Sequence, residues 1–130
     1  SLIHKAAHIM LEKLKKFKEV IQENDGLIYK SKVTIPNCFD VRLENEDYTL
    51  GKVLEYILYS KYFNKDSSTS DKSLTFCGFQ KPHPHMDVSF IRLGFVNEVD
   101  KAAVVVYVVN TIADAVRIYE KIATDFEQNN

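Results

Sequence analysis

Apolar residues spaced alternately three and four positions apart run along both ends of this 130-residue chain. Near the start they fall at Ile3, Ala7, Met10, Leu14, Phe17 and Ile21. Near the end they fall at Ala102, Val105, Val109, Ile112, Val116, Tyr119, Ala123 and Phe126. This spacing gathers apolar side chains along one edge of a helix, as in helices that lie side by side. We therefore predict two helices, over about residues 2–22 and 101–127, each with one apolar edge.

The ends of these helices have their own signals. Asn24-Asp25-Gly26 should stop the first helix, with Gly26 in a left-handed cap. Asp100 stands at the N-cap position of the last helix. The run AAVVVYVV at 102–109 has strong strand propensity, but the unbroken helical spacing favours a single helix. The first helix either needs a partner helix or lies on the chain's own sheet.

Alternating apolar residues between the two helices predict four strands, over 27–35, 39–44, 73–79 and 86–95. The pattern of the last strand shifts at Ile91, which indicates either a bulge or burial on both faces. A helix capped by Thr49 should reach Tyr62, with an apolar stripe at Leu50, Val53, Leu54, Ile57 and Leu58. Gly51 in its first turn predicts close packing of the helix against a neighbour. The order of elements predicts an α+β domain with an antiparallel sheet and helices on one face.

Composition narrows the class of protein. The net charge of -1 argues against a dedicated nucleic-acid surface. The longest apolar run, 102–109, is too short to span a membrane. Cys38 and Cys77 form no disulfide framework, which predicts an intracellular, reducing location. The chain begins at Ser1 rather than Met, which suggests a fragment or a processed chain.

Few residues suggest catalysis or metal binding. His4 and His8 have a helical spacing that can chelate a metal, but no third ligand accompanies them, so solvated surface histidines are favoured. His83 and His85 lie between prolines without a nucleophile motif, so a structural turn is favoured over a general base. Two charged clusters also have simple structural explanations. The carboxylates of Glu44, Glu46 and Asp47 would favour the positive N-terminal end of the helix that follows them. The lysines of the first helix would form a solvated helix face: Lys13, Lys15, Lys16 and Lys18.

Two segments resemble hallmarks of one family. Glu46-Asp47-Tyr48-Thr49-Leu50-Gly51-Lys52 is similar to the motif EDHTLGN, and Phe76-Cys77-Gly78-Phe79-Gln80-Lys81-Pro82-His83-Pro84-His85 is similar to FAGYxxPHPL. Both motifs are typical of the small dimerisation subunit of multisubunit RNA polymerases: subunit L of archaea, the eleventh subunit of eukaryotic polymerase II, and the bacterial alpha N-terminal domain. The likeness covers about residues 35–126. The positions that carry it are Glu46, Asp47, Thr49, Leu50, Gly51, Phe76, Gly78, Pro82, His83 and Pro84. Tyr48, Lys52 and His85 depart from the pattern, which would fit a viral or otherwise distant polymerase.

The resemblance implies a fold and a function. The fold is a four-stranded, mostly antiparallel sheet with helices on one face and a long C-terminal dimerisation helix. The function is assembly of a DNA-directed RNA polymerase for transcription. A heterodimer with a larger alpha-like subunit forms the platform for the large catalytic subunits. The chain itself would supply no catalytic residue, metal, cofactor, direct nucleic-acid contact or membrane contact.

The first helix, 1–24, resembles the terminal helix of the larger subunit, and 25–130 resembles the small subunit. We therefore expect that the parent chain fuses the two, and that their apolar edges meet within one chain or between chains. The isolated chain could also form a homodimer. The expected interface residues are Met10, Leu14, Phe17, Ile21, Val105, Val109, Ile112, Val116, Tyr119, Ala123 and Phe126. The expected location is the nucleus or cytoplasm, or a virion or viral factory for a viral protein.

Two other functions stay open on the sequence alone. A small nucleic-acid- or metal-binding domain would use the basic first helix and the Pro82-His83-Pro84-His85 loop, and would show salt-sensitive or metal-dependent behaviour. A small hydrolase is supported only by the pair His83 and His85.

Overall fold

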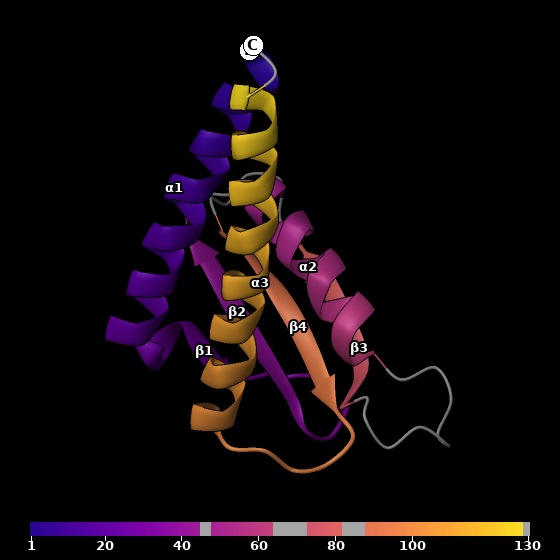
Figure 1. Ribbon diagram of the computed structural model, residues 1–130. Helices are drawn as coiled ribbons and strands as arrows, with labels where there is room; N and C mark the ends of the chain where they lie inside the picture. The colour runs from indigo at the N-terminus through magenta and orange to yellow at the C-terminus, as the bar shows by residue number, and fades with distance from the viewer. Residues whose placement is uncertain (45–47, 64–72, 82–87, 129–130) are drawn as a thin grey trace.

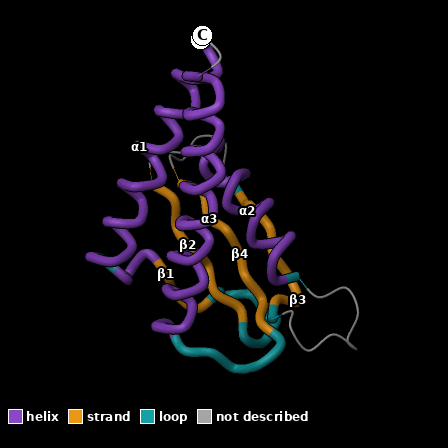
Figure 2. Tube along the Cα trace, in the orientation of Figure 1, coloured by secondary structure: helices purple, strands orange, loops and turns teal. Residues whose placement is uncertain are grey.

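The chain folds into one antiparallel sheet covered on one face by helices. The computed structural model describes residues 1–44, 48–63, 73–81 and 88–128. In chain order its elements are α1 (Leu2–Glu23), a 3-10 turn (Asp25–Leu27), β1 (Ile28–Lys30), β2 (Cys38–Glu44), α2 (Tyr48–Tyr62), β3 (Leu74–Gln80), β4 (Val88–Phe95) and α3 (Lys101–Gln128). The strand order is β1-β2-β4-β3, and every pair is antiparallel. Figures 1 and 2 show α1, α3 and α2 side by side over the same face. The α+β class, the four-stranded sheet and the long C-terminal helix are thereby confirmed.

The core lies between this sheet face and the three described helices. On the two central strands Phe39 pairs with Leu93 and Val41 with Ile91, and all four side chains are buried. Because side chains alternate across a strand, these residues share the face that the helices cover. Each helix adds fully buried residues to the same cluster, among them Leu14, Leu54 and Val104. The first helix is therefore part of the same hydrophobic core as the sheet.

The last helix forms despite its β-branched start. The carboxylate of Asp100 accepts a hydrogen bond from the Ala103 amide at 2.9 Å, as expected of an N-cap. Val104 and Val108 in the first two turns are buried in the core. Burial of these side chains outweighs a helix propensity deficit of a few tenths of a kcal/mol per β-branched residue. The prediction of one helix from Lys101 is confirmed.

By length and composition alone, the span Lys101–Asp125 of α3 could cross a membrane. The sequence prediction considered only unbroken apolar runs, and it therefore did not identify this helix as long and apolar enough to span a membrane. In the structure the helix packs against α1, α2 and β1. Only 28% of its most apolar window is buried in the domain, and Val106 and Ile118 are among the apolar side chains that face solvent.

Two predictions for the first connection are wrong. No described glycine has a positive φ, so Gly26 is not a left-handed cap. Instead the Asn24 side chain accepts a hydrogen bond from the Gly26 amide at 3.1 Å, and a 3-10 turn follows. The first strand ends at Lys30 rather than Ile35, because the chain turns away and Asn37 adopts a φ of 56° before β2. Asparagine tolerates this left-handed conformation better than most residues.

Two further details differ from the prediction. Thr49 lies inside α2, which begins at Tyr48, and a residue with helical backbone cannot be the N-cap. The bulge indicated as one alternative near Ile91 lies instead on the neighbouring strand, where the register shifts between Leu74 and Phe76. The start of the last predicted strand at Met86 lies outside the described residues, and β4 is described from Val88.

Candidate assembly interface

The helices α1 and α3 pair along their length within one chain. They run in opposite directions, so the start of α1 lies beside the end of α3 (Figure 1). Met10, Leu14, Phe17 and Ile21, predicted for the apolar edge of α1, are all buried. Ile3 does not follow the pattern because half of its surface is exposed. Towards the end of the pair, Ala7, Leu11 and Ala123 form a small second cluster.

The predicted edge of α3 is less deeply buried than a neighbouring strip. Ile112 and Ala123 are buried, Ala102 is exposed, and the side chain of Phe126 lies outside the described residues. The other predicted residues are half-buried and pack against the two clusters: Val105, Val109, Val116 and Tyr119. The most deeply buried strip is Val104, Val108, Thr111, Ile112 and Ala115.

The most deeply buried strip of α3 differs from the predicted edge because α3 has neighbours on three sides: α1, α2 and the sheet. Sequence reasoning assigned one edge and missed Val104 and Val108. A signal for them existed, since positions 104, 108, 111 and 115 are also spaced by three and four. The buried Thr111 hydroxyl is satisfied by donating to the Tyr107 carbonyl at 2.8 Å.

A shallow, mainly apolar groove follows the other flank of α3, where α2 runs beside it. We call it the α2–α3 groove. Its lining residues are Tyr48, Thr49, Lys52, Val53, Tyr56, Ile57, Ser60, Lys61, Asp114, Arg117, Ile118 and Tyr119. Three of its large side chains are open to solvent: Tyr56 at 74%, Tyr48 at 60% and Ile118 at 49%. Apolar and aromatic surface of this kind is typical of protein interaction sites.

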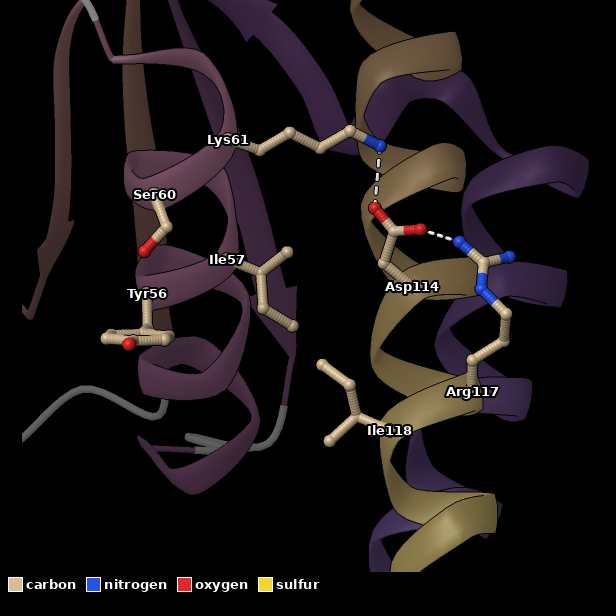
Figure 3. A pocket seen from close by; sticks show the side chains of 7 residues that line it. All are labelled: Tyr56, Ile57, Ser60, Lys61, Asp114, Arg117 and Ile118. Carbon is tan, nitrogen blue, oxygen red and sulfur yellow. Dashed lines mark hydrogen bonds and ion pairs between the residues drawn. The ribbon is translucent and has the colours of Figure 1, made fainter.

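Charged residues close one part of this groove. Lys61 on α2 reaches across to Asp114 on α3, with Nζ and Oδ2 2.6 Å apart, and Arg117 pairs with the other oxygen of Asp114 (Figure 3). Beside this bridge, Ile57 and Ile118 extend toward one another from the two helices (Figure 3). The bridge links α2 to α3 but leaves the apolar side chains of the groove uncovered.

Two of the family-like motif residues, Leu50 and Gly51, pack α2 against the sheet. A Cβ on Gly51 would overlap the Phe79 ring and lie 2.9 Å from Leu43 Cδ1, which confirms close packing at this glycine. One turn later the Glu55 carboxylate accepts a hydrogen bond from the Phe79 amide of the edge strand β3. Leu50 is buried in the core.

The remaining motif residues are less informative. Thr49 and Phe76 are exposed, and the Phe76 ring lies beside Gly78 on β3. The other predicted motif residues lie outside the described part of the chain: Glu46, Asp47, Pro82, His83 and Pro84.

The sheet face opposite the helices carries a partly buried ion pair. Arg92 on β4 donates to Asp40 on β2 through two nitrogens, at 2.9 and 3.2 Å. The hydrogen bond to Asp40 raises the pKa of the Arg92 guanidinium above its ordinary value. Such a bidentate pair fixes both side chains across neighbouring strands. Because Asp40 and Arg92 are bound to each other, we interpret the pair as a contact that stiffens the sheet rather than as a reactive site.

Neither cysteine has the properties of a nucleophile. Burial raises the pKa of the Cys77 thiol to about 12, and the nearby Glu55 charge adds to the effect. Burial also raises the pKa of Cys38. A reactive cysteine needs a lowered pKa and access to solvent. Both thiols therefore remain protonated at neutral pH.

The histidine and lysine candidates are placed as follows. His8 is exposed and His4 is half-buried on α1, where surface histidines were predicted, and their rings touch with the two Nε2 atoms 3.0 Å apart. Among the described residues no group of three or more metal-ligating side chains comes together. Lys15 and Lys16 are exposed on α1, and Lys13 and Lys18 are half-buried. His83, His85 and two members of the carboxylate cluster, Glu46 and Asp47, lie outside the described residues, as does the Glu44 side chain.

Comparisons with known proteins leave the family open. A scan against protein-family models gives no match, and a search of curated proteins gives none that is significant.

Proposed function

We propose that this chain is a non-catalytic assembly subunit of a DNA-directed RNA polymerase. In this proposal it is the small member of an alpha-like heterodimer that forms a platform for the large catalytic subunits. The motif-like segments around Gly51 and Phe76 support the family, and their described residues have a structural role that suits a scaffold. The arrangement offers hydrophobic surface and rigid packing, and a scaffold functions through these properties rather than through a reactive site.

The observation that carries the proposal is the pairing of α1 with α3. If α1 is the terminal helix of the larger subunit, fused ahead of the small one, its apolar edge should lie on the last helix of the small subunit. The buried Leu14 and Ile21 on α1 and the buried Ile112 on α3 fit this arrangement. The pairing within one chain also implies that this surface is already used and that a partner in trans must bind elsewhere.

We assign the trans surface to the α2–α3 groove. It lies on the opposite flank of α3 from α1, and it presents Tyr56 and Ile118 to solvent. An amphipathic helix of one of the large catalytic subunits would lay its apolar face into such a groove. Tyrosine is one of the residue types that contribute most of the binding free energy at the centre of an interface.

The test is co-purification from the native source of the tagged chain and of two variants. Ile118→Asp places a charge in the groove, and Ile9→Asp places the same charge on the outer face of α1, where Ile9 is 56% exposed. The wild-type chain and Ile9→Asp should retain the polymerase subunits, identified by mass spectrometry, and Ile118→Asp should lose them because an unpaired buried charge is costly. Absence of polymerase subunits from the wild-type sample would refute the function. Their retention by Ile118→Asp would refute the groove assignment.

Light scattering of the isolated chain separates the other functions. An assembly domain should keep the same mass with EDTA or with added nucleic acid. A mass that rises with nucleic acid in a salt-sensitive manner would favour a nucleic-acid-binding domain.

A further inference from the structure

We propose that His4 and His8 form a two-ligand site for a divalent transition metal of tetragonal preference, Cu²⁺ or Ni²⁺. The two residues lie one turn apart on α1, and their Nε2 atoms face each other at 3.0 Å. Imidazole nitrogens are common ligands for these metals. This inference concerns the α1 surface and is independent of the proposed assembly function.

The distance between the nitrogens selects the geometry. With metal–nitrogen bonds of about 2.0–2.1 Å, two nitrogens 3.0 Å apart subtend an angle of about 91–97° at the metal. That angle fits two adjacent positions of a square-planar or octahedral ion. Tetrahedral Zn²⁺ would need the nitrogens about 3.3–3.4 Å apart, at the same bond lengths. The spacing is therefore closer to that required by Cu²⁺ or Ni²⁺ than to that required by tetrahedral Zn²⁺. Both Nε2 atoms must be unprotonated to bind the metal, so the proton of the hydrogen bond that they share moves to the Nδ1 atom of its own ring.

The surroundings also suit a cation. The site is preorganised because both residues belong to a regular helix that begins with a cap, in which the His4 amide donates to Ser1 Oγ at 3.1 Å. His8 also lines a groove between α1 and α3 that contains two carboxylates, Glu12 and Glu120, against one ammonium, Lys15. Among the described residues no third metal-ligating side chain joins the pair.

The proposal is tested by titrating Cu²⁺ into untagged chain, with calorimetry for affinity and electron paramagnetic resonance for the ligands. The wild-type chain should bind one Cu²⁺ in a tetragonal site with two nitrogen ligands, and its melting temperature should rise because the metal binds only the folded pair. His8→Ala should weaken binding at least tenfold and abolish the rise. The double variant His8→Ala, Ile9→His keeps the number of histidines but breaks their spacing, and it should behave like His8→Ala.

Two other variants complete the test. The double variant His83→Ala, His85→Ala should bind Cu²⁺ as the wild-type chain does. If binding is lost in that variant, or is unchanged in His8→Ala, the proposed site is wrong. His4→Ala provides a second removal of one ligand, and far-UV circular dichroism establishes that each variant keeps its helices.

Discussion

Leu14→Ala tests whether α1 belongs to the folded core. Leu14 has no exposed surface and lies in the central cluster with residues of the sheet and of α3. Removing the larger part of a fully buried leucine costs lost burial plus a cavity, about 3 kcal/mol in total. For 130 residues the unfolding entropy is about 0.27 kcal/mol/K, so this loss lowers Tm by about 10 °C.

The assay is urea unfolding followed by circular dichroism, with calorimetry for Tm. Ile9→Ala is the matched control, because Ile9 is on the same helix but mostly exposed, and it should change stability by less than about 0.5 kcal/mol. Equal, small effects of the two substitutions would refute the packing of α1 on the sheet and α3. Loss of cooperativity confined to Leu14→Ala would show instead that α1 unfolds separately from the rest.

Three other substitutions probe single features, each by urea unfolding. Gly51→Ala should destabilise the fold by about 1–2 kcal/mol, since overpacking against Phe79 exceeds the gain in helix propensity; an increase in stability would contradict the close contact. Ser89→Ala should stabilise it by up to about 1 kcal/mol, because the buried Ser89 hydroxyl finds no hydrogen-bond partner in the described structure. Between pH 9 and about 12 an unfolded Cys77 thiol ionises while the folded one stays protonated, so stability should fall as pH rises through this window. Cys77→Ala should flatten that fall, and an unchanged slope would show that the thiol does not contribute.

Much of the fold follows from short-range patterns. The three-and-four spacing locates α1 and α3, and it outweighs the strand propensity of the run from Ala102 because burial of Val104 and Val108 decides the outcome. The errors lie where the backbone conformation of one residue determines where an element ends. Asn24 rather than Gly26 ends α1, and Asn37 turns the chain before β2. Hydrophobic periodicity contains no information about such conformations.

The candidate interface was only partly predictable. Spacing identifies the residues on one edge of a helix, but it cannot show how many neighbours the helix has. Consequently Val104 and Val108 were missed, and the α2–α3 groove with its Lys61–Asp114 bridge was not anticipated. The bridge joins residues 53 positions apart, which no local pattern reveals.

The short link between α1 and β1 has a consequence for how the chain assembles. Only Asn24 and a three-residue 3-10 turn separate the helix from the first strand. So short a tether keeps α1 at a high effective concentration beside α3, and dilution cannot separate them. Exchange of α1 between two copies would require the first strand to detach as well. A partner that arrives later therefore meets a preformed helical layer of fixed one-to-one stoichiometry.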